Sequence, residues 1–407
     1  MPSAEALKPL PPLTAVAASL RAVTERLAHE LASPQPAGPD WSEFEWRIAR
    51  AVAAMHGVSG LLAGELRWPG PEGWVEFLGR QREHIGRRQR RLSQLLENIA
   101  ERCGREGIPV QALKGAALHL EGLYRPGERP MADLDLLTSP QHAVRAAEVL
   151  ESLGLREAYR TFKHRVFEAR DTPRPRRFGE HADNDLKVEL HERICEALPL
   201  HVTDITQWVF SPQAVPGLNP YPSRAALMTH LLLHAAGGMA YRTLRAIQLH
   251  DIALLAPRLT VPDWHQLLER RPWWAWPPLA LTAKYYGAAE PQGITSAARN
   301  LTPAILRRTC MRQLLSDVSL SRLWLEAFPG IEWARTPGEA VAFIARRIVP
   351  SAAVRSDRKL ALTTDPSLVH GDWGGLSQGR RILRAVRTRT PRPWPLHNVR
   401  EAVSEPR

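Results

Sequence analysis

Two aspartates separated by one residue, Asp133 and Asp135, lie in the stretch MADLDLL at residues 131–137. Successive side chains of a β-strand point to opposite faces, so in a strand these carboxylates share one face, and Leu134 and Leu136 share the other. Like charges held this close repel each other and shift each other's pKa. A cation relieves the repulsion, and Mg²⁺ in proteins usually binds through one or two carboxylates together with substrate phosphates. The spacing therefore predicts a site for Mg²⁺, or for Mn²⁺ in its place.

A third carboxylate comes from the stretch DLKVELHER at residues 185–193, which alternates in the same way. Its apolar face consists of Leu186, Val188 and Leu190, and its polar face of Lys187, Glu189 and His191. If this strand lies beside the aspartate strand, Glu189 joins Asp133 and Asp135. Three carboxylates on adjacent strands can hold two metal ions, which stabilise the attacking and leaving oxygens of an in-line phosphoryl displacement. One of them can also accept the proton of the attacking hydroxyl. For His191, metal contact and a structural hydrogen bond both stay open.

A lysine–glycine turn precedes the aspartates. The run IPVQALKG at residues 108–115 is short, apolar and bounded by glycine, which predicts a strand, and the AALHLEGLY that follows predicts a short helix. The first amides of a helix lack internal partners and bind phosphate oxygens. Gly115 would let a phosphate approach the backbone, and Lys114 would add a positive charge. Arg129, four residues before Asp133, is placed to reach a triphosphate. The alternatives are a surface position for Lys114 and a loop salt bridge for Arg129.

The elements around these residues predict an α+β fold. Strands and helices mix over residues 105–200, which favours a small mixed β-sheet as the core. The flanks look helical, with an N-terminal helical region at residues 41–104 and a C-terminal helical domain at residues 201–350. Residues 1–40 form a Pro/Ala-rich segment of loop composition. Residues 351–407 form a basic, Arg/Pro-rich tail with weak periodicity, which we expect to be partly disordered.

The net charge and the cysteines indicate which partners and which cellular compartment to expect. The 407 residues carry a formal net charge of +12, which attracts phosphate-bearing partners such as nucleotides, nucleic acid or a membrane surface. The basic run RQREHIGRRQRR at residues 80–91 is more typical of a solvated helix face than of a nucleic-acid patch. No apolar run approaches the roughly 20 residues of a membrane span, and no signal peptide is recognisable. Three separated cysteines match no zinc spacing and indicate a reducing cytoplasm.

Two histidines lie outside this chemistry. His230 and His234 are four residues apart on a predicted helix, which would allow both to contact one metal ion. No glutamate follows His230, so the zinc-protease motif is absent. A structural or acceptor-pocket role is therefore favoured over zinc binding.

Taken in order, these residues resemble the nucleotidyltransferase superfamily of DNA polymerase β, in which a glycine turn opens a helix, Asp-x-Asp follows on a strand, and a third carboxylate lies on a later strand. The chain is more closely similar to the family of uncharacterised nucleotidyltransferases, in which Leu-Lys-Gly replaces the usual Gly-Ser turn. Residues 113–115 match that turn, residues 129–137 match its R-x-M-x-D-x-D-L-L pattern, and residues 189–191 match its E-L-H element. Residues 232–235 and 251–255 resemble the LLHA and DIALL elements that come later in the family's sequences.

This resemblance covers about residues 85–260 and implies a nucleotidyltransferase core. It implies transfer of a nucleoside monophosphate from an NTP to an unidentified hydroxyl or phosphate acceptor, with pyrophosphate leaving and Mg²⁺ or Mn²⁺ as cofactor. The acceptor is a small molecule, a peptide or a protein. The implied catalytic and metal-binding residues are Asp133, Asp135 and Glu189, and the implied nucleotide-binding residues are Lys114, Gly115 and Arg129.

Two other interpretations stay open. The chain could be a catalytically inactive binding or scaffold protein that keeps the fold and uses its basic tail to contact nucleic acid or an acidic partner. It could also modify RNA, although only the net charge points to nucleic acid. All three carboxylates are present, and a degenerate copy has no need of them, so the enzyme interpretation is favoured.

Overall fold

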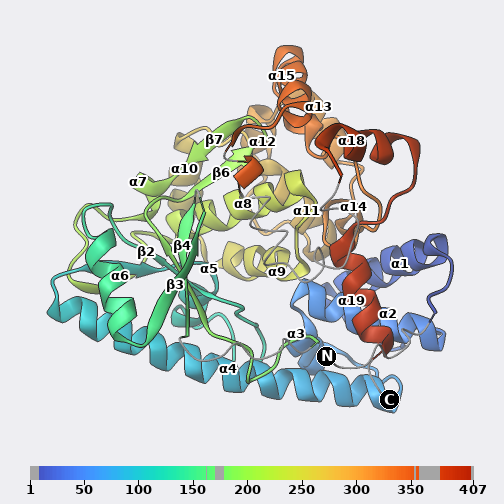
Figure 1. The fold of residues 1–407 in the computed structure, drawn as a ribbon, viewed down its shortest axis with the longest axis horizontal. Helices are drawn as coiled ribbons and strands as arrows, with labels where there is room; N and C mark the ends of the chain where they lie inside the picture. Colours follow the sequence, from blue (N-terminus) through green and yellow to red (C-terminus); the bar gives the residue numbers. More distant parts are fainter. Residues whose placement is uncertain (1–8, 162, 170–177, 353, 357–375, 405–407) are drawn as a thin grey trace.

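The computed structural model describes residues 9–161, 163–169, 178–352, 354–356 and 376–404. A six-stranded mixed sheet lies at one side of the molecule, and helices from both ends of the chain gather at the other (Figure 1). The long helix α4 runs along one edge and connects the two parts (Figure 1). The predicted α+β class with a small mixed sheet is confirmed.

The helices have the following bounds. They are α1 (Leu13–Ala32), α2 (Glu43–His56), α3 (Ser59–Glu65), α4 (Glu72–Arg105), α5 (Lys114–Leu120), α6 (Ala143–Ser152), α7 (Thr206–Val209), α8 (Arg224–Tyr241), α9 (Ala246–Leu255), α10 (Val261–Glu269), α11 (Trp276–Tyr286), α12 (Gln292–Leu301), α13 (Ala304–Cys310), α14 (Leu315–Val318), α15 (Pro337–Ile348), α18 (Gln378–Arg387) and α19 (Pro393–Ser404).

The six-stranded sheet has the order β3-β4-β5-β2-β1-β8. Its strands are β1 (Pro109–Ala112), β2 (Leu134–Leu137), β3 (Leu155–Arg160), β4 (His164–Ala169), β5 (Lys187–His191) and β8 (Gly217–Asn219). β2 is parallel to β5 and β1 is parallel to β8, whereas the other neighbours are antiparallel. A separate pair consists of β6 (Cys195–Leu198) and β7 (His201–Asp204). The strand that carries Glu189 therefore lies beside the aspartate strand, as predicted.

Alternation along β2 divides its side chains between two surroundings. Leu134 and Leu136 are buried in a core that α4 and α6 complete on one face of the sheet. Leu137 belongs to the other core, which is built from the helical part. Asp135 shares the face of Leu137 because the two are two residues apart. The carboxylate thus points toward α8 and α9 and away from the apolar core of the sheet.

Helices from the two ends of the chain share one core. Leu20 of α1 and Val52 of α2 are buried in the same cluster as Leu232 of α8 and Leu249 of α9. The regions predicted at residues 41–104 and 201–350 therefore pack together around apolar side chains from both. The domain boundaries themselves stay predictions.

The loop interpretation of residues 1–40 is wrong for α1. Val16, Leu20 and Val23 recur at every third or fourth position and are completely buried. This is the apolar stripe of an amphipathic helix that packs on a core. The prolines on either side of α1 dominate the composition of the segment and obscure that period.

The tail at residues 351–407 contains two helices, α18 and α19, that its weak periodicity did not indicate. α19 packs against α2, with Val399 and Ala402 fully buried (Figure 1). Arg47 of α2 donates a hydrogen bond of 2.8 Å to a carbonyl of α19. This part of the tail is therefore a structural element of the helical core. Residues 357–375 of the predicted tail lie outside the described residues.

His56 joins three distant segments at the end of α2. Its Nδ1 accepts a hydrogen bond of 2.9 Å from the amide of Ala246, at the start of α9. Its Nε2 therefore carries the proton and donates to Ser321 Oγ at 2.7 Å. Burial, with a smaller contribution from nearby Arg245, lowers the pKa of His56 to about 3. The folded protein thus holds a neutral imidazole in this position.

We expect His56 to make the protein sensitive to acid. An unfolded histidine protonates near its ordinary pKa of 6.5, whereas folded His56 does so near 3, so its contribution is complete above pH 6.5 and is lost as the pH falls toward 3. Between pH 7.5 and pH 5 the free energy of unfolding should drop by about 2 kcal/mol from this group. Urea unfolding at the two pH values measures it. His56→Asn should be less stable than wild type at pH 7.5, but its free energy of unfolding should fall less between pH 7.5 and pH 5. The exposed His265→Asn should show the same fall as wild type.

Candidate active site

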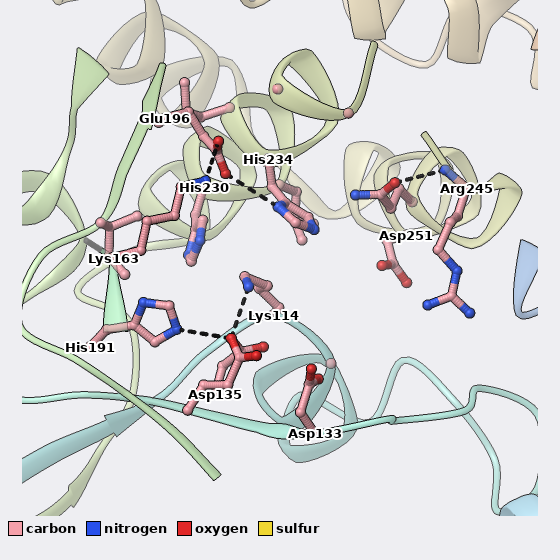
Figure 2. Close-up of a pocket in the computed structure, with 18 of the residues that line it drawn as sticks. Lys114, Asp133, Asp135, Lys163, His191, Glu196, His230, His234, Arg245 and Asp251 are labelled. Atoms are coloured by element: carbon pink, nitrogen blue, oxygen red, sulfur yellow. Dashed lines mark hydrogen bonds and ion pairs between the residues drawn. The ribbon is translucent and has the colours of Figure 1, made fainter. Parts of the chain in front are cut away.

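A cavity of about 520 Å³ lies between the sheet and helices α8 and α9 (Figure 2). All six residues that the sequence predicts for the site line it, namely Lys114, Gly115, Arg129, Asp133, Asp135 and Glu189. Further charged or imidazole side chains on its wall are Lys163, His164, His191, Arg193, Glu196, His230, His234, Arg245 and Asp251. The cavity therefore gathers residues from segments that are far apart in the chain.

The three carboxylates gather through the parallel pairing of β2 and β5. Asp135 lies directly opposite Glu189 in the register of these strands, so both side chains leave the sheet on the same face. Asp133 precedes β2 and also faces the cavity. The predicted convergence of the three acidic side chains is therefore present in the fold. Their catalytic and metal-binding roles stay predictions.

Asp135 accepts two hydrogen bonds from basic side chains on a single oxygen (Figure 2). Lys114 Nζ lies 2.9 Å and His191 Nε2 3.0 Å from Oδ1. Although burial opposes ionisation, Lys114 and the hydrogen bond from His191 hold the pKa of Asp135 well below its ordinary value. Asp135 is thus a stable anion, and Lys114 lies against a carboxylate. The phosphate contact predicted for Lys114 stays a prediction.

The pKa of Asp133 is shifted in the opposite direction to that of Asp135. Burial, followed by the negative charges of Asp135 and Glu189, raises the pKa of Asp133 to about 7. The positive charges of Lys114 and Arg245 lower the pKa of Asp133, but they do not compensate for these two effects. A half-buried carboxylate in this position favours a bound proton or a bound cation.

We expect Asp133→Asn to stabilise the metal-free protein. The folded pKa of about 7 exceeds the ordinary 3.8, so stability from this group is lost as the pH rises from 3.8 to 7. At pH 8 in a chelator the variant should therefore gain at least about 1 kcal/mol in free energy of unfolding. Urea unfolding measures the gain, which should shrink at pH 5. The exposed Asp40→Asn should change little, and a loss of stability in Asp133→Asn at pH 8 would contradict the argument.

The lysine–glycine turn has an unusual backbone. Lys114 begins α5 with a φ of 44°, in a region that residues other than glycine rarely adopt. Its amide donates to the hydroxyl of Tyr221 at 3.4 Å. Gly115 packs against Arg129, since a Cβ at Gly115 would lie 2.2 Å from Arg129 Nη1. The glycine therefore makes room for a guanidinium, and a phosphate contact at Gly115 stays a prediction.

Arg129 is buried and forms an ion pair with Asp251 of α9. Its Nε and Nη2 each donate to one carboxylate oxygen at 2.8 Å, and Nη1 donates to the carbonyl of Pro130 at 3.2 Å. Tyr124 donates a third hydrogen bond to Asp251, at 2.6 Å. A salt bridge was the alternative to triphosphate binding for this arginine, and it is present. Contact with a phosphate stays a prediction.

Arg88 of α4 holds the two segments that lead into β2 and β5. Its Nη2 donates to the carbonyl of Ala132 at 2.6 Å and to the carbonyl of Asp185 at 2.8 Å. Ala132 immediately precedes Asp133, and Asp185 lies just before β5. This member of the basic run at residues 80–91 thus has a structural role that a solvated helix face does not describe.

Arg245 is a site residue that the sequence analysis missed. It lines the cavity near Asp133, and its Nε donates to the carbonyl of Met55 at 3.0 Å. Among the described residues, no carboxylate lies within 4.0 Å of its guanidinium. Burial lowers its pKa, so the charge is held in a position that lacks a full counterion. No local pattern could have revealed it, because its position depends on contacts with α2, about 190 residues away.

A second polar group was also missed. Lys163 Nζ donates to Glu196 Oε2 at 2.6 Å, and His234 Nδ1 lies 3.7 Å from the other oxygen (Figure 2). Burial opposes ionisation of Glu196, but the nearby His234 and the charge of Lys163 lower the pKa of Glu196 to about 2. Gly237 of α8 makes room, since a Cβ there would lie 2.9 Å from Glu196 Oε2.

His230 and His234 have separate partners. His230 Nδ1 lies 2.8 Å from the hydroxyl of Tyr221, whereas His234 faces Glu196. Within the part of the chain that the structure describes, the one group of three side chains arranged to hold a metal ion consists of His164, Glu189 and His191. The two α8 histidines line the cavity wall, and their structural or acceptor-pocket role stays a prediction.

A mixed sheet that presents acidic side chains to a deep cavity, with helices on the opposite wall, is the arrangement of a nucleotidyltransferase core. The comparison with known families agrees, because the model of the family described as uncharacterised nucleotidyltransferase matches residues 42–281. The chain belongs to this family, as its resemblance predicted, and membership indicates a transferase that moves nucleotidyl groups. No curated protein and no solved structure gives a significant match. None of the helices in the described residues combines the length and apolar character that a membrane crossing needs.

Proposed function

We propose that the protein transfers a nucleoside monophosphate from an NTP to a hydroxyl or phosphate acceptor and releases pyrophosphate. The observation that carries the proposal is the pairing of β2 and β5, with Asp135 opposite Glu189 and Asp133 alongside, at the wall of one cavity. At about 520 Å³ the cavity falls in the range of about 300–1,000 Å³ that is typical of ligand sites. Family membership supports nucleotidyl transfer in general terms.

A divalent cation suits these residues. Asp133 and Asp135 offer oxygen donors. Burial, followed by the charges of Asp135 and Glu189, raises the pKa of Asp133, which favours a cation beside this carboxylate. Asp133, Asp135 and Glu189 are the residues that would hold Mg²⁺ or Mn²⁺. When bound, the ion supplies Lewis-acid polarisation of the phosphates and neutralises charge on the leaving pyrophosphate.

The chain's own side chains would bind and orient the triphosphate. Arg245 is a cation without a carboxylate partner among the described residues, so an anionic phosphate would satisfy it. Lys114 would exchange its contact with Asp135 for a phosphate oxygen. In the transfer, the acceptor oxygen forms a bond to the α-phosphorus, the bond to pyrophosphate breaks, and a carboxylate of the site accepts the hydroxyl proton.

The acceptor would bind on the side of the cavity formed by α8 and β6. Lys163, Glu196 and His234 provide a cation, an anion and an imidazole there, which suits a polar acceptor. A small molecule, a peptide or a protein side chain would all fit this description. RNA is supported only by the net charge of the whole chain.

The scaffold alternative is disfavoured by the energetics of the site. An inactive protein gains nothing from a carboxylate such as Asp133, whose pKa is raised by burial and then by repulsion from Asp135 and Glu189. Its basic tail also includes α19, which serves the helical core. A catalytic function would explain these destabilising contacts, because active sites are where such pKa shifts are concentrated.

To test the proposal, the protein is incubated with each of the four NTPs, labelled on the α-phosphate, in the presence of Mg²⁺ or Mn²⁺. A cell extract, with or without RNase treatment, supplies the acceptor. We expect pyrophosphate release with one NTP and a labelled adduct that mass spectrometry identifies. Arg245→Met should lower the rate by about 10–100-fold through weaker triphosphate binding. The exposed Arg156→Met on β3 serves as the matched control. If neither pyrophosphate nor adduct forms with any NTP, the proposal is wrong.

A further inference from the structure

His164, Glu189 and His191 form a compact group on the cavity side of the sheet. β4 and β5 are antiparallel neighbours, and their register sets His164 directly opposite His191. Glu189 is two residues from His191 in the same strand, so it shares that face. The three side chains thus come from two neighbouring strands of the sheet and owe their proximity to backbone pairing.

Two distances in this group are within or close to the range between ligands of a single metal ion. His164 Nδ1 lies 3.3 Å and His191 Nε2 3.7 Å from Glu189 Oε2. All three ligand atoms lie within 4.8 Å of one another. Ligands at about 2.1 Å from an ion are roughly 3.0–3.4 Å apart for octahedral to tetrahedral angles. Only small side-chain adjustments would therefore close the group around an ion.

His164 provides an independent indication. The side chain is only 16% exposed, and its Nδ1 is buried without a hydrogen-bond partner. Buried polar atoms without a partner are rare and destabilising. This nitrogen faces the carboxylate at a distance that an ion would bridge. The orphaned atom is thus explained if a cation occupies the space among the three residues.

The donor set selects the kind of metal. Two imidazoles and one carboxylate suit Zn²⁺ and similar transition metals, whereas Mg²⁺ prefers oxygen ligands alone. We propose that His164, Glu189 and His191 bind a transition-metal ion of the Zn²⁺ class. This site shares Glu189 with the oxygen site of Asp133 and Asp135, and the ion would replace the proton that His191 Nε2 now donates to Asp135.

This second site has a consequence for catalysis, and that consequence rests on the proposed function. The mixed site lies on β4 and β5, and the Lys163–Glu196–His234 group lines the same cavity. An ion there would lie between the triphosphate side and the acceptor side, where it would bind and orient the acceptor group. The protein would then need Mg²⁺ with its nucleotide and one transition-metal ion of its own.

Metal binding can be measured without nucleotide or activity. The purified full-length protein is treated with a chelator, dialysed and titrated with Zn²⁺ by calorimetry. It is also titrated with Co²⁺, whose visible spectrum reports the coordination geometry of the bound ion. We expect one equivalent of Zn²⁺ that millimolar Mg²⁺ does not displace. His164→Ala should weaken binding at least tenfold, and His164→Asn, which keeps a polar side chain of similar size, should do the same if the alanine variant is unstable. His234→Ala, in the same cavity, should bind Zn²⁺ as wild type does.

Three outcomes would overturn the proposal: no Zn²⁺ binding by wild type, full binding by both His164 variants, or loss of binding in His234→Ala. These results are independent of NTP turnover. If Zn²⁺ binds as expected but no NTP is consumed, the proposed function fails and the metal site stands. If NTP is consumed and the His164 variants keep full Zn²⁺ affinity, the metal site fails and the proposed function stands.

Discussion

Asp135→Asn should reduce pyrophosphate release by about 10³-fold or more. Asparagine keeps the shape of the side chain but removes the anionic oxygen that Lys114 and His191 now contact at 2.9 and 3.0 Å. The site would lose a carboxylate whose pKa lies well below its ordinary value and which therefore stays ionised at any working pH. Initial rates of pyrophosphate release at saturating NTP and Mg²⁺ measure the effect.

The control for this variant must separate lost chemistry from lost folding. Asp135→Asn leaves the ammonium of Lys114 without its carboxylate, which is destabilising for a group only 19% exposed. Circular dichroism and thermal unfolding should therefore accompany the rates, and Lys114→Met combined with Asp135→Asn removes the unpaired charge. Glu168→Gln, on β4 outside the cavity, should stay within about twofold of wild type. A wild-type rate in folded Asp135→Asn would refute the role of this carboxylate.

Local periodicity predicted the face of each acidic side chain. Alternation in β2 and β5 separates Asp135 and Glu189 from the leucines around them, and this depends only on strand geometry. Their adjacency needed one further condition, which was the pairing of two strands about 50 residues apart, and that pairing is present. The sequence could therefore predict which residues converge.

Contacts between distant segments could not be predicted in the same way. Arg245 enters the cavity because α2 and α9 pack together, and Asp251 meets Arg129 across 122 residues. His164 joins the site through a register that no local pattern determines. Composition was misleading as well, since proline-rich surroundings concealed α1. These positions follow from tertiary packing, which overrides local sequence signals.

The buried ion pair between Arg129 and Asp251 should give the largest effect on stability. Asp251→Ala removes the acceptor of two hydrogen bonds from Arg129 and one from Tyr124. The guanidinium, only 10% exposed, would then be a buried charge without its counterion. We expect a loss of about 3–5 kcal/mol in the free energy of unfolding, because breaking one side of a buried pair leaves the other uncompensated. Urea unfolding at pH 7.5 measures it. Glu83→Ala, which breaks an exposed pair with Arg87 on α4, should cost less than about 0.5 kcal/mol.

Replacing both partners then tests whether Arg129 has a second role. Arg129→Met with Asp251→Leu removes both charges together, so most of the stability should return, since apolar replacements of a buried pair are often neutral or stabilising. If Arg129 only anchors the loop before Asp133, this double variant should also recover its rate of pyrophosphate release. If Arg129 contacts the triphosphate, the variant should be stable but have a KM for NTP raised about tenfold or more. A double variant as unstable as Asp251→Ala would contradict the ion-pair argument, because the loss would then come from packing around Asp251 and not from an unpaired arginine.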